Sequence, residues 1–233
     1  MRAVRYVLIP VAMALAVGPA LAWAQNNAKE ILALEPAKLV EILKNPSAPV
    51  FDKAKACQRL AVVGTKDAIP ALVALLPDEK LNLYARFGLE GIPDPAVDEA
   101  LRDAAAKLQG RQLVGVIDSI GQRQDPQAVN ALTKFMYGAD AGAAQAAIAT
   151  LGRISGDAAT TALQAGLAKT KDPLRSAVAA ACLVCAEGLL AKGGRQQALS
   201  LYDRLSRPDI PKPVRLAAMH RTIATETAPG RPR

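Results

Sequence analysis

Aromatic side chains make up only 3% of this 233-residue chain, which contains one tryptophan and one histidine. A single globular core of this size usually depends on large aromatic residues to fill its volume. Here alanine and leucine take that place, within a hydrophobic fraction of 51%. Both are strong helix formers, and small aliphatic side chains suit layers in which helices approach closely. The shortage of aromatic residues therefore favours thin helical layers over one thick core.

Several functional motifs are also missing. The sequence has no P-loop, no Gly-x-Gly-x-x-Gly and no Gly-x-Ser-x-Gly motif. A lone histidine excludes most hydrolase schemes that depend on histidine. The formal net charge is +8, yet no run of five basic residues occurs. Without such a patch, and with few aromatic residues for base stacking, nucleic-acid binding is disfavoured.

The dipeptide Ala-Leu recurs at five places, each in an apolar, helix-like segment. The steps between its leucines are 29, 31, 31 and 36 residues. A period in this range is typical of solenoids built from stacked helix pairs. We expect the alanine of each dipeptide to lie where helices approach closely. The five dipeptides are Ala71-Leu72, Ala100-Leu101, Ala131-Leu132, Ala162-Leu163 and Ala198-Leu199.

Aspartate, proline and glycine separate these segments. Aspartate can cap a helix start, and proline is tolerated at the first helical position. Glycine can take the left-handed conformation that ends a helix. We therefore expect helix starts at Asp67, Asp94, Asp125, Asp140, Asp157 and Asp172, and helix ends at Gly64, Gly121 and Gly152. First helices are predicted near 51–62, 80–90, 111–120, 141–151 and 173–190, and second helices near 67–76, 95–108, 126–136, 157–168 and 195–205.

Three stretches of the chain resemble HEAT repeats of the armadillo-type superhelix, in particular those of exported bacterial proteins. They read KACQRLAVVGTKDAIPALVALL at 55–76, YARFGLEGIPDPAVDEALRDA at 84–104 and AIATLGRISGDAATTAL at 147–163. The resemblance covers roughly residues 50–225 and implies an all-α solenoid of about five helix pairs plus a final unpaired helix. Residues 191–205 depart from it toward a tetratricopeptide-like pattern.

The resemblance implies a protein partner held on a curved surface. Relatives include bilin lyases and modules of larger exported proteins, but no catalytic motif of theirs is matched here. An accessory module of an envelope or polysaccharide-acting system remains an alternative, as does a lyase-like or thiol-redox enzyme. We expect no cofactor, no metal and no catalytic residue.

The first 24 residues have the pattern of a secretory signal. Arg2 and Arg5 precede an apolar run over 7–17, and Ala22 and Ala24 supply the small residues of a cleavage site. The run is short for the roughly 20 residues of a membrane span, so we expect cleavage rather than anchoring. The mature protein is then periplasmic or extracellular, without a stable membrane span. It divides into a helical cap at 25–49, the repeats at 50–225 and a disordered tail at 226–233.

Cys182 and Cys185 form a Cys-x-x-Cys pair, which in an exported protein raises a thiol-redox alternative. Reactive pairs of this kind sit at a helix N-terminus, where the dipole lowers the thiol pKa. Here about nine predicted helical residues precede Cys182. We therefore interpret the pair as small buried residues. Cys57 lies too many repeats away to complete a zinc site, and His220 is expected to be a partly buried structural residue.

Two surfaces are candidates for contacts with other chains. If the second helices line the concave face, a polar ridge there would meet the partner. The ridge consists of Glu99, Asp103, Asn130, Lys134, Thr161 and Gln197. The other candidate is the last helix, near 213–225, which has no helix after it to cover its apolar side chains. That end is predicted to self-associate or to fray; the side chains concerned are Val214, Leu216, Ala217, Met219 and Ile223.

Overall fold

The computed structural model describes residues 27–227. The expected leader at 1–24 and the tail from residue 228 onward lie outside this range. Residues 226 and 227, which we assigned to a disordered tail, belong instead to the last helix. Residues 27–32 form a short helix at the start of the array.

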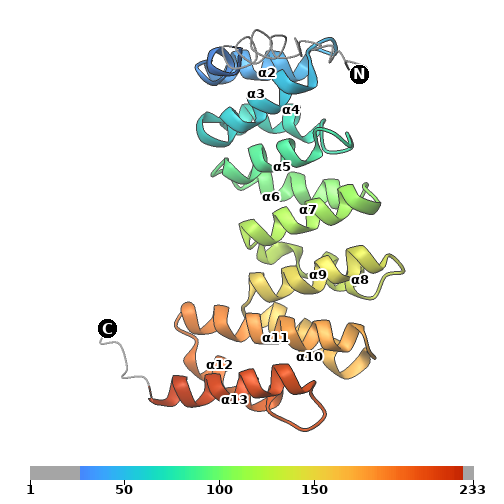
Figure 1. Ribbon diagram of the computed structural model, residues 1–233, viewed down its shortest axis with the longest axis vertical. Coiled ribbons are helices and arrows are strands. Elements are labelled where there is room, and N and C mark those ends of the chain that lie inside the picture. The colour runs from blue at the N-terminus through green and yellow to red at the C-terminus, as the bar shows by residue number, and fades with distance from the viewer. Residues whose placement is uncertain (1–26, 228–233) are drawn as a thin grey trace, which may run out of the picture.

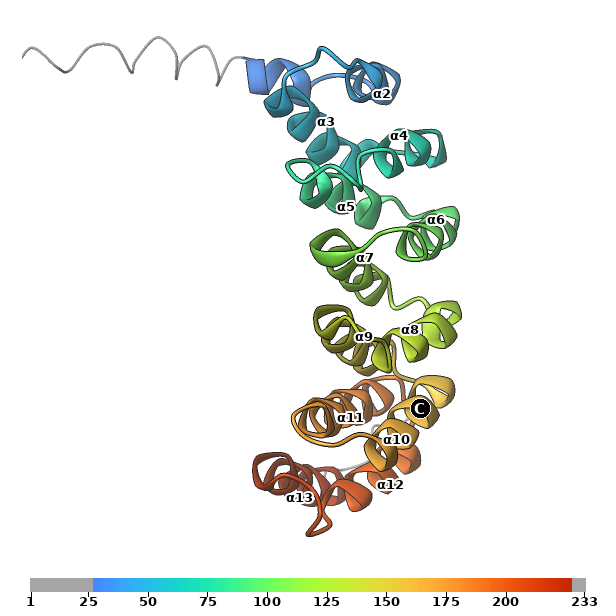
Figure 2. The same ribbon diagram turned by 90° about the vertical axis from the view of Figure 1, so that its right-hand side faces the viewer.

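The helices stack in two layers along one axis (Figures 1 and 2). The layer of first helices, here the A layer, contains α3 (Val50–Val63), α5 (Asn82–Gly91), α7 (Gly110–Arg123), α9 (Ala141–Ile154), α11 (Leu174–Ala191) and α13 (Lys212–Thr227). The B layer contains α2 (Pro36–Lys44), α4 (Ile69–Val73), α6 (Ala96–Ala105), α8 (Val129–Met136), α10 (Asp157–Lys169) and α12 (Arg195–Leu205). Short 3-10 turns, η1 (Lys66–Ala68) and η2 (Pro126–Ala128), lead into α4 and α8. Within the described residues, α3 to α12 form five pairs and α13 has no partner, which confirms the predicted all-α solenoid.

The repeat leucines form the spine of the core. Leu72, Leu101 and Leu163 are fully buried, and Leu132 nearly so. In the last pair, Ala198 is buried and Leu199 is only half-buried. The buried position of the dipeptide is therefore one residue earlier than in the other pairs.

The prediction for the alanines holds only in part. Ala71 is buried, Ala100 and Ala162 are half-buried, and Ala131 is exposed. Neighbouring residues on a helix point about 100° apart, so a leucine aimed at the core turns the residue before it aside. Ala131 is therefore not at a close helix contact, and that prediction is wrong.

Close approach occurs instead at glycines of the A layer. A Cβ atom added at Gly91 of α5 would lie 2.1 Å from the backbone oxygen of Ala61 in α3. One added at Gly152 of α9 would lie 2.8 Å from the backbone oxygen of Ala181 in α11. Neighbouring backbones therefore meet at these positions with no room for a side chain.

The predicted left-handed glycine caps are wrong. Gly64 has an extended conformation, with φ of −67°. α7 and α9 continue past Gly121 and Gly152, and the residues with positive φ after them are Gln124 and Ser155. Gly121 lies beneath the guanidinium of Arg153, so its role, like that of Gly152, is to let a neighbour approach.

Aspartates cap several helices as expected. The side chain of Asp140 accepts hydrogen bonds from the backbone amides of Gly142 and Ala143 at the start of α9. Asp125 does the same for Gln127, and Asp94 for Ala96. Asp67 makes no such bond, because η1 has already begun at Lys66. These caps supply acceptors for backbone amides that have no partner inside the helix.

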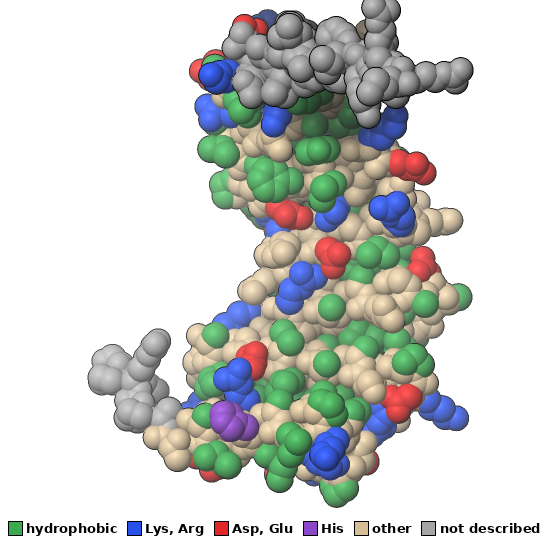
Figure 3. Space-filling view, in the orientation of Figure 1, with side chains coloured by type: hydrophobic (Ala, Val, Ile, Leu, Met, Phe, Trp, Pro, Cys, Tyr) green, Lys and Arg blue, Asp and Glu red, His purple; other side chains and the backbone are tan. Residues whose placement is uncertain are grey.

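The array is bowed, with the A layer on its hollow side (Figure 2). Close packing of A-layer helices explains the direction, since the layer with the shorter spacing must lie on the inside of the bend. Our expectation that the second helices line the concave face is therefore wrong. The A layer faces the viewer in Figures 1 and 3.

One described helix is long and apolar enough to cross a membrane by length and composition. This is α11, with a mean hydropathy of 1.7 over 18 residues. We expected no such segment after the leader. In the array α11 packs against α9, α10 and α12, and it buries residues such as Val178, Cys182 and Leu189. Core helices of stacked arrays have the same apolar character.

We predict that Gly91→Ala destabilises the array by about 1–3 kcal/mol, because the new methyl group would overlap backbone that cannot rotate away. Gly142→Ala is the matched control, since a Cβ atom there meets only side-chain atoms, at 3.3 Å. Urea unfolding followed by circular dichroism measures both. Equal midpoints for the two variants would contradict the close contact between α3 and α5.

Candidate interaction surface

Large hydrophobic side chains are exposed mainly on the A layer. Of eleven such residues in the described part of the chain, nine lie on A-layer helices. They are Val50, Phe51, Val62, Leu83, Phe87, Val184, Leu216, Met219 and Ile223. Figure 3 shows this face, with hydrophobic side chains gathered over the N-terminal helices and again over the last ones. Single exposed apolar residues are ordinary, but their concentration on one face marks an interaction surface.

Leu83 and Phe87 are the central pair of this set. They are four residues apart on α5 and therefore share one helix face. Their side chains are 62% and 52% exposed, while Ala85 and Leu89 of the same helix are fully buried. α5 thus has apolar side chains that do not pack against the rest of the array, in addition to those that do.

A cleft of about 340 Å³ adjoins this pair, between α5, α7 and α9. Its apolar side is Leu83 and Phe87, and its polar side carries Arg86, Asp118 and Arg153. Two further clefts, of about 310 and 440 Å³, also share Arg86 and extend to Arg111. We call the combined depression the A-face groove; it is lined by Leu83, Arg86, Phe87, Arg111, Asp118 and Arg153.

Hydrogen bonds between repeats hold the polar side of the A-face groove in place. Arg86 donates to the Asn82 side chain at 3.0 Å and to the Gly115 carbonyl of α7 at 3.0 Å. The Ser119 hydroxyl, also on α7, donates to Glu90 of α5 at 2.5 Å. These bonds tie α5 to α7 below the surface.

A second contact joins α7 to α9. Arg153 donates from Nη2 to Asp118 Oδ1 at 3.1 Å and to the Thr150 hydroxyl at 3.1 Å. Asp118 is about half exposed, so its carboxylate remains open to a donor from outside. The groove therefore presents fixed charges of both signs beside an apolar pair, as the core and rim of a protein interface do.

All six residues of the predicted polar ridge are exposed. Glu99 and Asp103 lie on α6, Asn130 and Lys134 on α8, and Thr161 and Gln197 on α10 and α12. They share a layer as the spacing indicated, but this is the B layer, on the convex side of the bow (Figure 2). None of the three clefts that make up the A-face groove includes any of them.

Both residues of the Cys-x-x-Cys pair are fully buried in α11, with free thiols. Burial, and to a lesser extent the nearby Cys185, raises the pKa of the Cys182 thiol to about 12, against a smaller opposing effect of Arg204. Burial also raises the pKa of Cys185, whose sulfur lies 3.3 Å from the Thr160 hydroxyl. Thiol exchange needs an accessible thiolate, so this environment opposes the redox alternative.

Metal binding finds no support in the described residues, where no group of three or more His, Cys, Asp or Glu side chains could hold an ion. His220 is exposed on α13, which corrects our expectation of a partly buried residue. The reason is its place on α13, because no later helix within residues 27–227 covers the outer side. Leu216, Met219 and Ile223 of α13 are exposed for the same reason, as predicted.

The A-face groove was missed in the sequence, although a signal for it exists. The segment 81–89, LNLYARFGL, has apolar residues around most of the helix rather than on one stripe. A helix that buries only one side needs an apolar stripe of little more than 100°. The excess at Leu83 and Phe87 was the available indication of a second contact surface.

The comparisons with known proteins concern the fold. A family model described as HEAT repeats matches residues 98–183. Among solved structures, an engineered protein is 18% identical, with 94% of this chain and 67% of that chain covered and a TM-score of 0.42. Human deoxyhypusine hydroxylase, solved with glycerol, is 15% identical over 88% of this chain and 98% of its own, with a TM-score of 0.31. Similarity at this level carries no argument about activity. No curated protein matches this chain.

We predict that the three thiols of the native protein resist modification at pH 8. Burial raises the pKa of Cys57 and Cys182 to about 12, so almost none of either thiol is ionised at that pH. A chromogenic disulfide reagent should react slowly with the native protein. In guanidinium chloride, which unfolds the protein, the same reagent should react with all three thiols. Rapid reaction of two thiols in the native state would restore the redox interpretation.

Proposed function

We propose that this chain, in which residues 98–183 match a family model described as HEAT repeats, is a non-catalytic scaffold that binds a partner protein along the A-face groove. The observation that carries the proposal is the exposure of Leu83 and Phe87 beside the fixed charges of Arg86, Asp118 and Arg153. HEAT arrays typically serve as scaffolds for protein interactions. The buried thiols and the exposed, isolated His220 support a role without catalysis.

The geometry of the groove favours an extended or helical segment of the partner. The groove crosses three successive A-layer helices, α5, α7 and α9, and so runs along the stack. Leu83 and Phe87 would bury against apolar side chains of the partner. A few large buried side chains usually contribute most of the binding free energy of an interface. Arg111 and Asp118 at the edges would set orientation and specificity more than affinity.

The polar ridge of the B layer stays a second candidate surface. Its six residues are exposed, but no apolar anchor lies among them. Exposed charge pairs contribute little affinity by themselves, since water competes for the same groups. We therefore place the main contact on the A face.

We predict that Leu83→Ser with Phe87→Ser weakens partner capture by at least about tenfold, since two buried anchors contribute more than 1.4 kcal/mol together. The wild-type protein is used to capture partners from the exported fraction, followed by mass spectrometry. The amount of each captured protein is then compared between the variant and the wild type.

Two controls separate the surfaces. Tyr137→Ser removes an exposed large side chain outside the A layer and should leave capture unchanged. Glu99→Lys, Asp103→Lys and Lys134→Glu together reverse the charges of the polar ridge. Loss of capture only in this charge-reversed variant would indicate that the partner binds to the B layer and not to the A-face groove.

We also propose that the chain is exported, with residues 1–24 removed. The support is the sequence pattern alone: basic residues, an apolar run and small residues at Ala22 and Ala24. N-terminal sequencing of the exported fraction should therefore find a protein that begins near Gln25. A full-length product retained in the membrane would refute cleavage.

The exposed end of the array supports a further proposal, self-association through α13. Leu216, Met219 and Ile223 recur at three- and four-residue steps and form one uncovered apolar stripe. A terminal unit of a solenoid normally has a polar outer face, because an uncapped end exposes the next stacking surface.

Light scattering should therefore show a molar mass that rises with protein concentration. Leu216→Ser with Ile223→Ser should abolish the rise and leave the helical content unchanged. A monomer at every concentration would contradict this proposal without bearing on the A-face groove.

A further inference from the structure

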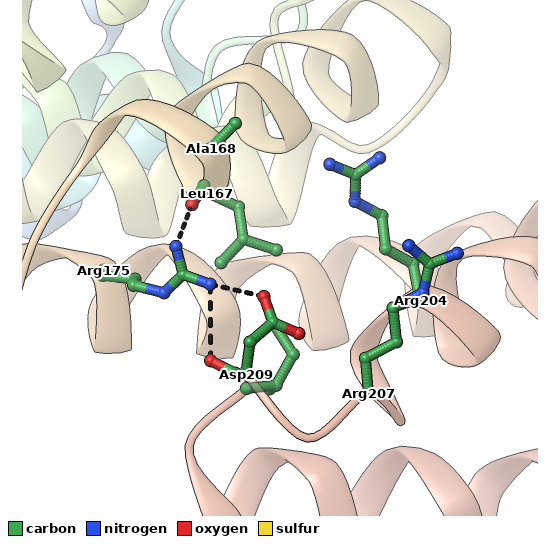
Figure 4. A pocket seen from close by; sticks show the side chains of 7 residues that line it. Leu167, Ala168, Arg175, Arg204, Arg207 and Asp209 are labelled. Atoms are coloured by element: carbon green, nitrogen blue, oxygen red, sulfur yellow. Dashed lines mark hydrogen bonds and ion pairs between the residues drawn. The ribbon is translucent and has the colours of Figure 1, made fainter.

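Arginine side chains from different elements converge at a cleft near the C-terminal end of the array (Figure 4). The cleft has a volume of about 170 Å³ and lies between the end of α10, the start of α11, the end of α12 and the turn before α13. Its lining is Leu167, Ala168, Arg175, Arg204, Arg207, Asp209 and Ile210. It shares no residue with the A-face groove.

On one side of the cleft, the charge of Arg175 is already matched. Its Nη2 atom donates to the Asp209 carboxylate at 2.7 Å. Its Nη1 atom donates to the Leu167 carbonyl at 2.7 Å, in the last turn of α10 where carbonyls have no partner within the helix. Asp209 is thereby neutralised locally, and Arg175 is fixed at the edge of the cleft.

The other side of the cleft is different. Among the described residues, no acceptor lies within hydrogen-bonding distance of the guanidinium of Arg204 or Arg207, and no carboxylate pairs with either. Arg204 is half-buried, and its charge is felt at the buried Cys182, whose thiol pKa it lowers against the effect of burial. Figure 4 shows these two side chains across the cleft from Arg175 and Asp209.

Two unmatched guanidinium groups beside one cleft repel each other, and the partial burial of Arg204 removes some of the water that would screen its charge. One carboxylate cannot relieve this repulsion, because Asp209 is already bound to Arg175. An anion of charge −2 would balance both groups at once. Planar guanidinium groups present parallel N–H donors that match the oxygens of such an anion.

The cleft is large enough for a small anion. Its volume of about 170 Å³ accommodates a phosphate group together with a water or a small attached group. Leu167 and Ile210 add apolar surface to the lining, which strengthens hydrogen bonds to a charged ligand.

We propose that this cleft binds a compact dianionic oxyanion, either inorganic phosphate or a small phosphate monoester, through Arg204 and Arg207. Arg175, held by Asp209 and the Leu167 carbonyl, lies at the edge of the cleft with its charge already balanced. The two free guanidinium groups supply the hydrogen bonds, and binding joins the end of α12 to the turn before α13.

Isothermal titration of the full-length protein tests this with inorganic phosphate as the probe, at pH 7.5 and constant ionic strength. Saturable one-to-one binding is expected. Arg204→Gln with Arg207→Gln should weaken it by at least about tenfold, the cost of losing one or more hydrogen bonds to a charged group. Lys66→Gln with Lys107→Gln is the charge-matched control, since both lysines are exposed in other repeats. This control should bind as the wild type does.

The single variant Arg207→Gln covers the case in which the double variant does not fold, because Arg207 is exposed. It should weaken binding at least threefold, an effect of about 0.65 kcal/mol. A parallel titration with glycerol 3-phosphate distinguishes the sources: binding of both probes identifies a monoester site, and binding of phosphate alone identifies the free ion. Absence of saturable binding, or an equal loss in the lysine control, would overturn the proposal.

Discussion

The close approach of neighbouring A-layer helices is the constraint on which the rest of this structure depends. Gly91 and Gly152 permit backbone-to-backbone contact, and Arg86 and Arg153 then reach from one helix to the next. Because this spacing is short in one layer only, the stack bends toward it. The bend carries the exposed apolar residues of α5 to the hollow side. Backbone contact, curvature and the A-face groove thus have a common cause.

The B layer has a different part in holding the array together. Around α6, two charged contacts link this layer to the following repeat. Arg102 of α6 pairs with the buried Asp125 before η2, and Arg123 of α7 pairs with Asp98 of α6 while donating to the Ile92 and Asp94 carbonyls. Partly buried pairs of this kind fix geometry as much as they add stability, since removing one partner leaves an uncompensated charge. The convex side therefore has defined positions without close helix packing.

The sequence predicted the helices better than their packing. The Ala-Leu period and the Asp-Pro dipeptides placed every helix pair from α3 to α12, because local capping and apolar spacing determine helices locally. The glycines were misassigned because glycine serves both as a cap and as a point of close approach, and only the neighbouring helix decides between these roles. The same limit explains why Leu83 and Phe87 went unnoticed. Whether an apolar side chain is buried depends on a neighbour about 30 residues away, not on its own helix.

Contacts restricted to adjacent units also determine how such a molecule responds to force. Within residues 27–227, the main helix contacts join neighbouring units, so a force along the long axis acts on each junction in turn. Straightening the bow lengthens the A layer, on the hollow side, more than the B layer, so the close contacts at Gly91 and Gly152 oppose it. A stretched molecule flattens its hollow face only as these contacts open. Tension and occupancy of the hollow face are then mechanically coupled, because a shape that fits a partner at rest no longer fits it under load.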